Sequence, residues 1–255
     1  NNQRAFDLPI AGILHTDCPH HYRFAELDES EEAFSQRLAD SLERLILAEG
    51  PDTIAAFFAE PVMGAGGVIV PPAGYFERIQ AVLRKYDVLV VADEVICGFG
   101  RTGSLWGSQT FGMTPDILTT AKNLSSGYMP ISAVMISEPI FAAIAEQSDQ
   151  IGVFGHGFTY GGHPVAAAVA LEALKIYEER DIVGRVRQLA PHFQAGLRAF
   201  ADHPLVGEAR GIGLIGALEV VQDKADHTPF DGSLAVAAKI VAKAQDQGVI
   251  LRSMG

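Results

Sequence analysis

Two charged residues of complementary chemistry each close a short apolar run. Asp93 follows Val88-Leu89-Val90-Val91-Ala92, and Lys122 follows Ile117-Leu118-Thr119-Thr120-Ala121. Apolar runs without polar alternation predict fully buried parallel strands. In an open α/β sheet the ligand crevice lies beyond the carboxyl ends of such strands, so this carboxylate and this amine can face one site. Pyridoxal phosphate chemistry requires such a pair, because the amine forms a Schiff base and the carboxylate pairs with the pyridinium nitrogen.

Each of these residues also has an ordinary interpretation. A carboxylate such as Asp93 can cap the turn after its strand, and a lysine at a strand end is often a surface residue. Lys122 nevertheless follows a mostly apolar run directly, and lysine is rarely buried without a reason. Burial lowers the pKa of an amine and makes it nucleophilic, so we expect Lys122 to be buried and reactive.

The surrounding segments predict the elements that must position this pair. Strands are expected over 54–62 and 131–136, with helices over 30–48, 74–86, 138–147 and from 165 onward. Ser30 is expected to cap the first helix, and Gly50-Pro51 to end it. Strands that alternate with helices in this way indicate a mainly parallel α/β sheet.

The pattern changes from about residue 181. The spacing predicts a helix up to 201, a strand over 213–221, a helix over 233–247 and a last strand over 249–251. We therefore predict part of a large domain over residues 1–178 and a small, incomplete α+β domain over residues 179–255.

Composition excludes several classes of function. The 255 residues include 31 acidic and 19 basic ones, with a formal net charge of −12. Nucleic-acid binding depends on basic surfaces, so no nucleic-acid partner is expected. No apolar run reaches the ~20 residues that span a bilayer, so no membrane association is expected. Two cysteines are too few for a disulfide scaffold, which favours a cytoplasmic location, with Cys97 as a small buried hydrophobe.

Three motifs suggest other chemistry but fail on context. Residues 98–103 and 211–216 both match the dinucleotide fingerprint GxGxxG. No helical period follows the first match, and a strand-like run follows the second, so we predict no NAD binding. The segment 15–21 contains three histidines, an aspartate and a cysteine. Its spacing fits no familiar zinc pattern, so we expect a solvated loop and no metal.

The residues at the two strand ends resemble those of the class III (subgroup II) aminotransferases, and in particular the omega-amino acid:pyruvate transaminases. The likeness continues in register through 57–62, 158–164 and 209–214 and covers essentially the whole chain. It implies the α/β fold of the fold type I pyridoxal phosphate-dependent transferases, with a mainly parallel large domain and a small C-terminal domain. It also implies pyridoxal 5'-phosphate as the cofactor.

The resemblance implies roles for residues around that cofactor. Lys122 would carry the cofactor and later move a proton, and Asp93 would keep the ring nitrogen protonated. Val95 would pack against one ring face, because alternation along a strand turns it to the same side as Asp93. Ordinary core packing remains an alternative for Val95. Glu60 matches a carboxylate near the cofactor, whose role is left open.

Two further residues are implied at the edges of the site. Thr159, in a glycine-rich turn before a helix, would reach the phosphate of the neighbouring subunit's cofactor, which implies a homodimer with shared active sites. Arg252 would bind a substrate carboxylate as a bidentate pair. A plain loop and a surface arginine are the alternatives. Gly162 stands where serine is frequent in the family, so a hydroxyl contact is missing there.

The function implied is a ping-pong transamination, of the EC 2.6.1 class, from an amine or omega-amino acid to a keto acid such as pyruvate. A same-fold aminomutase, decarboxylase or racemase is an alternative, as is a non-catalytic protein that has kept the fold. The family also carries a preceding segment with a Gly-Ser-Glu-Ala type phosphate loop and a stacking aromatic, neither of which occurs here. We therefore expect a fragment that lacks the N-terminal part and the extreme C-terminus, with exposed apolar surface.

Overall fold

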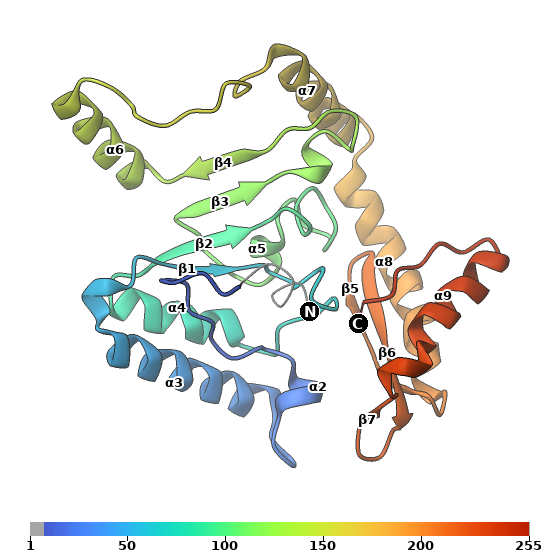
Figure 1. Cartoon of the computed structure of the whole chain (residues 1–255). Coiled ribbons are helices and arrows are strands. Elements are labelled where there is room, and N and C mark those ends of the chain that lie inside the picture. The colour runs from blue at the N-terminus through green and yellow to red at the C-terminus, as the bar shows by residue number, and fades with distance from the viewer. Residues whose placement is uncertain (1–7, 255) are drawn as a thin grey trace.

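A computed structural model describes residues 8–254 of the chain (Figure 1). Its first part builds one sheet in the order β1 (Ala56–Ala59), β2 (Leu89–Asp93), β3 (Ile117–Thr120) and β4 (Ala133–Ile136). β1, β2 and β3 are parallel, and β4 runs antiparallel to β3. The mainly parallel sheet predicted from the apolar runs is confirmed. Its predicted strands at 54–62 and 131–136 are shorter than expected.

Two helices cover one face of this sheet. α3 (Glu31–Glu49) packs on α4 (Tyr75–Lys85), and α4 packs on β2 (Figure 1). The Ser30 hydroxyl accepts a hydrogen bond from the backbone N–H of Ala33, and Gly50 with φ of 94° ends the helix, as predicted. Their shared core is formed by buried apolar side chains: Phe34, Leu38, Leu42 and Ile46 of α3; Phe76, Ile79 and Leu83 of α4; Val90, Ala92 and Leu118 of the sheet.

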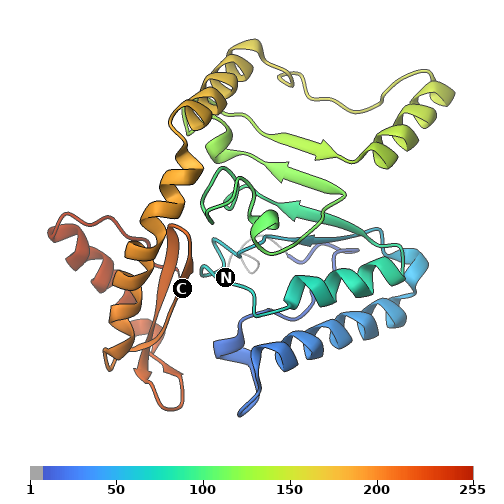
Figure 2. The same cartoon turned by 180° about the vertical axis from the view of Figure 1, so that it is seen from behind.

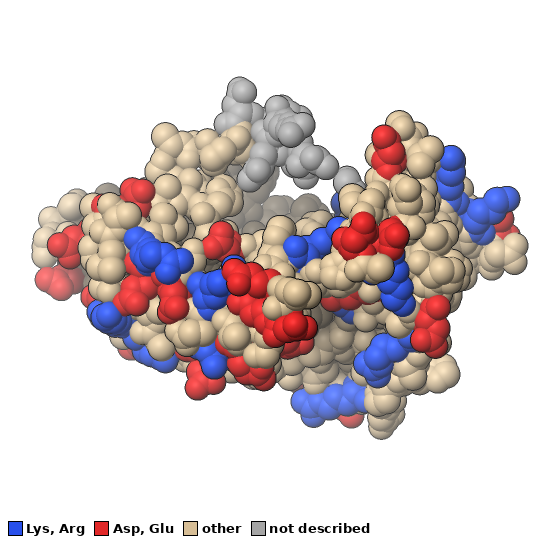
Figure 3. Space-filling view, turned by 90° about the horizontal axis from the view of Figure 1, so that it is seen from below, with Lys and Arg blue, Asp and Glu red and all other residues tan. Residues whose placement is uncertain are grey.

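The outer surface of α3 carries charges of both signs. Figure 3 shows acidic and basic side chains interspersed on the face seen from below. Two ion pairs contribute to this pattern, Arg37 to Glu29 at 2.7 Å and Lys85 to Glu43 at 2.6 Å. Glu29 is partly buried and accepts two hydrogen bonds from Arg37, whereas Lys85 is largely exposed, so its pair contributes little to stability.

The β4 side of the sheet exposes apolar side chains, as expected from the sequence. Val134 of β4 is 64% exposed, and α6 (Glu138–Ile151) buries none of its residues. The segment from 152 to 163 continues this exposed surface and reaches along one side of the molecule to α7 (Pro164–Glu179) (Figure 1).

The C-terminal part forms a second, antiparallel sheet. α7 is followed, after a break, by α8 (Ile182–Arg198), which packs on β5 (Val206–Ile212) and β6 (Ile215–Asp223) (Figure 2). β7 (Thr228–Pro229) completes this sheet, and α9 (Val236–Asp246) follows. The described residues also form the short helices α2 (His21–Phe24), α5 (Gly107–Thr110), η1 (Pro51–Thr53), η2 (Lys122–Leu124), η3 (Ala199–Asp202) and η4 (Gly232–Leu234).

One prediction for this part is wrong, and one strand was not predicted. β5 was not expected, and the strand predicted over 249–251 does not form. An apolar run becomes a strand only when a neighbouring strand satisfies its backbone groups. No strand of the described residues pairs with this run, and Ile250 is 92% exposed.

The predicted domain boundary between residues 178 and 179 falls at the end of α7, just before the chain enters α8. The division stays a prediction. His20, directly before α2, and Arg23 of α2 contact the three-stranded sheet, so the two parts are joined by polar contacts. No helix of the described residues is both long enough and apolar enough to cross a membrane.

Candidate active site

Three charged residues lie at the carboxyl edge of the parallel strands. Glu60 directly follows β1, Asp93 ends β2, and Lys122 comes two residues after β3. The register pairs Ala59 with Ala92 and Asp93 with Thr119, which sets the three strand ends side by side. Because parallel strands end at the same edge, residues from distant parts of the sequence are brought to one place.

Glu60 interacts electrostatically with both of the other two residues. Its carboxyl group is half-buried and accepts a hydrogen bond of 2.9 Å from the backbone N–H of Gly64. Burial raises the pKa of Glu60, and the negative charge of Asp93 adds to this rise. The hydrogen bond and the positive charge of Lys122 partly oppose the rise. Glu60 thus lies within electrostatic range of both Asp93 and Lys122.

Asp93 is half-buried, and one of its oxygens is occupied. Oδ1 accepts a hydrogen bond of 3.0 Å from the backbone N–H of Val95. Among the described residues, no hydrogen bond to Oδ2 is formed, so this oxygen remains available to a ligand. The bond is an Asx-type turn, in which a carboxylate holds the backbone two residues on. The ordinary capping role and a ligand role are therefore compatible for Asp93.

Val95 does not lie on the strand, which corrects the argument used to place it. β2 ends at Asp93, so strand alternation no longer decides the direction of the Val95 side chain. Val95 lies in the following turn and is half-buried. Its contact with a ring face stays a prediction.

Lys122 is exposed in this chain, so the expected burial is wrong. The apolar run before it is buried only as far as β3 extends, and the chain then turns away from the sheet. Lys122 has φ of 42°, in the left-handed region, and begins η2. Within the described part of the chain its amine makes no hydrogen bond and no ion pair. The amine is therefore free to bond a ligand.

Glu94 is a structural residue of the site that the sequence reasoning missed. Its side chain is fully buried, and its two oxygens accept hydrogen bonds from the backbone N–H groups of Gly107 at 2.8 Å and Ser108 at 2.6 Å. These are the first residues of α5, whose free N–H groups favour a carboxylate. A Cβ atom on Gly107 would lie 2.7 Å from that of Cys97, so only glycine fits there. The contact fixes the turn that follows Asp93.

Replacing Glu94 with alanine is expected to lower the free energy of unfolding by about 3 kcal/mol, because two buried N–H groups lose their acceptor. Urea unfolding followed by circular dichroism measures this change. Glu178→Ala, on the exposed surface of α7, is the matched control and should stay within ~0.5 kcal/mol of the parent protein. Equal stability of both variants would show that the Glu94 contacts contribute nothing.

Thr159 and Arg252 are not brought to the other three residues. Both side chains are exposed, and neither makes a hydrogen bond or ion pair within the described residues. Thr159 lies in a turn that includes Gly162, whose φ of 67° explains why glycine can replace a serine there. Arg252 follows a segment without regular structure. Their roles stay predictions.

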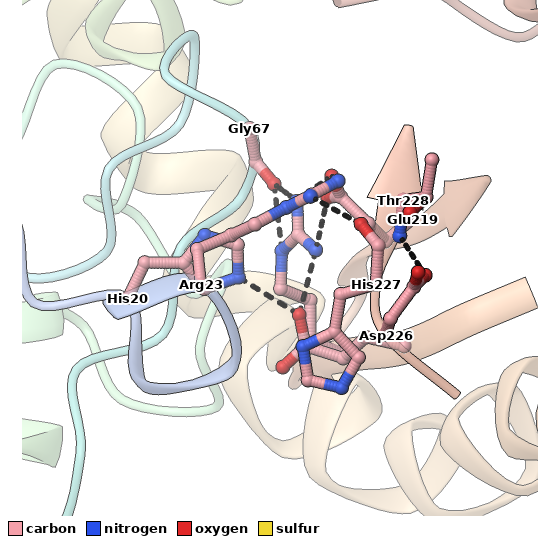
Figure 4. A network of polar contacts seen from close by, with 9 residues as sticks. His20, Arg23, Gly67, Glu219, Asp226, His227 and Thr228 are labelled. Atoms are coloured by element: carbon pink, nitrogen blue, oxygen red, sulfur yellow. Dashed lines mark hydrogen bonds and ion pairs between the residues drawn. The ribbon is translucent and has the colours of Figure 1, made fainter. Parts of the chain in front are cut away.

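The segment that offered zinc-type ligands contains a buried histidine. His20 is 6% exposed, and its Nε2 lies 2.9 Å from Oε2 of Glu208 (Figure 4). The expectation of a solvated loop is therefore wrong for His20. The sequence could not reveal this contact, because the two residues are 188 positions apart.

His20, Glu208 and Glu219 lie close enough to form a candidate metal site. However, Arg210 Nη1 lies 2.8 Å from Oε2 of each glutamate, and Arg23 donates to Oε1 of Glu219. Burial alone would raise the pKa of both glutamates. Hydrogen bonds from His20, Arg23 and Arg210 oppose this, and the pKa of each glutamate is lowered. Guanidinium groups thus occupy the oxygens that a cation needs. The cluster is an ion-pair network that joins α2 to β5 and β6 (Figure 4).

Comparison with known proteins assigns the family. The model of the family "Aminotransferase class-III" matches residues 6–255. The tomato (Solanum lycopersicum) protein "Gamma aminobutyrate transaminase 3, chloroplastic" is 55% identical over 250 residues, which cover 98% of this chain and 48% of the relative. A rice (Oryza sativa subsp. indica) protein named "Probable gamma-aminobutyrate transaminase 3, mitochondrial" is 54% identical, with 98% of this chain and 49% of the relative covered. The chain thus spans about half the length of these curated relatives.

Solved structures agree with this assignment. A "Transaminase with L-ala" matches with a TM-score of 0.97 and 61% identity over 100% of this chain and 60% of that one. The omega transaminase from Pseudomonas jessenii in complex with PMP matches with a TM-score of 0.96 and 58% identity over 100% of this chain and 56% of that one. The mixed sheet is that of the fold type I transferases, as expected. The chain belongs to the class III aminotransferases.

Proposed function

We propose that the protein containing this chain is a pyridoxal phosphate-dependent transaminase. It would move an amino group from an amine or omega-amino acid to a keto acid such as pyruvate. One observation carries the proposal: Glu60, Asp93 and Lys122 converge at the carboxyl edge of three parallel strands. The names of the relatives, gamma-aminobutyrate transaminases and omega transaminases, support a donor whose amine is remote from a carboxylate.

The residues at the strand ends fit the family's cofactor. Class III aminotransferases depend on pyridoxal phosphate. Lys122 has an amine without a protein partner among the described residues, and Asp93 keeps one oxygen free.

Each residue would have a distinct task in the reaction. The bound cofactor supplies a protonated ring that withdraws electrons from the substrate carbon. Asp93 would hold the proton on the ring nitrogen, and partial burial strengthens that pairing. Lys122 would attach the cofactor. Its released amine would then take a proton from the substrate Cα and deliver it to C4′ of the cofactor. Glu60 would lie near the cofactor beside Asp93.

The complete site would need groups from beyond this edge of the sheet. We assign Val95 to one ring face and Arg252 to the carboxylate of the acceptor. Thr159 would bind the phosphate in a partner subunit, and its exposure in the segment from 152 to 163 leaves it accessible to one. A homodimer with shared sites, a cytoplasmic location and the division into domains at 178/179 belong to the same proposal.

A half-reaction on a polypeptide of the relatives' full length that carries this sequence tests the proposal. The protein is loaded with pyridoxal phosphate and given gamma-aminobutyrate, or an amine without a carboxylate, but no acceptor. Transamination predicts one carbonyl product for each cofactor converted to its amine form, and pyruvate should reverse the conversion. A decarboxylase, aminomutase or racemase would leave the cofactor in its aldehyde form. No spectral change with any donor would indicate a non-catalytic protein.

A further inference from the structure

The turn that carries Lys122 has an unfavourable backbone conformation. Lys122 has φ of 42° and Ser126 has φ of 51°, both in the left-handed region that residues other than glycine rarely adopt. Such conformations persist only where the surrounding structure holds them. The turn also borders a cavity of about 120 Å³, lined by Asn123 among others, so close packing does not support it on that side. Leu124 of the turn is buried in a cluster with Phe99 and Ala170, and hydrogen bonds hold the turn where this packing is absent.

Besides the hydrogen bonds within the turn, Tyr177 of α7 supplies two from another element. Its hydroxyl donates to the backbone carbonyl of Asn123 at 2.9 Å and lies 2.8 Å from the hydroxyl of Ser126. A tyrosine hydroxyl has one proton, and a carbonyl can only accept. Because the proton of Tyr177 goes to Asn123, the Ser126 hydroxyl must donate to Tyr177. Tyr177 thus binds the turn at Asn123 and at Ser126, and Asn123 directly follows Lys122.

Other contacts hold Tyr177 and Asn123 in place. The ring of Phe99 stacks on the ring of Tyr177, with centroids 5.6 Å apart. Arg101 donates to the side-chain oxygen of Asn123 at 3.2 Å, and the backbone carbonyl of Arg101 accepts from Leu214 at 3.0 Å. The side chain of Asn123 therefore also has a partner. The turn is therefore anchored to α7 and to the residues between β5 and β6.

We propose that Tyr177 is a positioning residue for Lys122. Its hydroxyl fixes the backbone of the turn from 122 to 126 and thereby the direction of the Lys122 amine. The inference rests on the proposed function, because the direction of the amine matters only if Lys122 carries the cofactor. Tyr177 lies two residues before the end of α7, so the position of α7 would also decide where Lys122 points.

Tyr177→Phe tests the proposal, because it removes one oxygen and keeps the ring on Phe99. The experiment uses the full-length polypeptide. Tyr86→Phe is the matched control, because it also removes a single tyrosine hydroxyl. That hydroxyl donates a hydrogen bond of 2.8 Å to Glu43, away from the site. Amide hydrogen exchange of the peptide covering 122–128 is measured without cofactor. We expect this peptide to exchange about tenfold faster in Tyr177→Phe than in the parent protein. In Tyr86→Phe its exchange rate should be unchanged.

A kinetic measurement separates positioning from general stability. We expect kcat of Tyr177→Phe to fall about tenfold, with the thermal midpoint and the KM for the acceptor unchanged. Parent-like exchange at 122–128 in Tyr177→Phe would overturn the inference. If that variant instead exchanges faster throughout the protein, Ser126→Ala decides: faster exchange confined to 122–128 supports the inference, and unchanged exchange there refutes it.

Failure of this inference and failure of the proposed function give different results. Exchange is measured in the cofactor-free protein, so it does not depend on any reaction. Without transamination in the half-reaction, the proposed function fails whatever the exchange rates are. With transamination but unchanged exchange, the function stands and the role of Tyr177 is refuted.

Discussion

Alanine in place of Lys122 is expected to reduce turnover of the full-length protein by at least about 10³-fold. The variant loses both the group that attaches the cofactor and the group that moves the proton at the substrate Cα. It should also lose the absorption band of cofactor bound to lysine. Steady-state assays with a donor and pyruvate, together with absorption spectra after cofactor addition, measure both effects.

Two further variants make this test specific. Lys122→Arg keeps a positive charge but not a nucleophilic amine, so it should be as inactive as alanine. Lys85→Ala removes an exposed lysine whose ion pair with Glu43 contributes little, and it should keep full activity. Full activity of Lys122→Ala would refute the assignment of the active site.

Asparagine in place of Asp93 is expected to reduce kcat by about 10²-fold or more, which corresponds to ~3 kcal/mol of transition-state stabilisation. The amide oxygen can still accept the hydrogen bond from Val95, so the turn should survive. The negative charge that holds a proton on the ring nitrogen is lost, and with it the electron withdrawal that the reaction needs. Single-turnover rates with a saturating donor measure the effect without product release.

Asp116→Asn is the matched control for Asp93. Asp116 directly precedes β3, at the opposite edge of the sheet, and its Oδ2 accepts a hydrogen bond of 2.8 Å from Val90. The same change of carboxylate to amide there should leave the rate within about twofold. If Asp93→Asn were equally mild, Asp93 would be only the cap of its turn, and the pairing with the cofactor would be wrong.

The parallel strands and the residues at their ends could be predicted because the signal is local. A buried strand must be apolar on both faces, and the first charged residue after it marks where the chain leaves the sheet. Asp93 and Lys122 were found in this way, and Glu60 through the resemblance. The cap of α3 by Ser30 is likewise a short-range contact that needs no knowledge of the rest of the fold.

The burial of Lys122 and the position of Val95 were mispredicted because β3 and β2 end earlier than expected, whereas the other failures depended on distant partners. β5 contains glycines and charges that argue against a strand, but His20 bonds Glu208 there and Glu219 of β6 bonds Arg210. The run from 249 to 251 has the composition of a strand but no neighbour within the described residues. The fully buried Glu94 escaped notice for the same reason, since its partners lie at α5.

Residue types and their order along the chain were thus enough to identify which amine and which carboxylate could act together, and in which family. The tertiary structure decides the rest, because it arises only when β1, β2, β3 and α7 pack together. This packing places the residues at one edge of the sheet, leaves Lys122 exposed and lets Tyr177 bond the turn that carries Lys122. The reason is physical. Local sequence controls strand formation and capping through short-range sterics and burial, whereas electrostatic coupling and hydrogen bonds between distant segments exist only after the chain has folded.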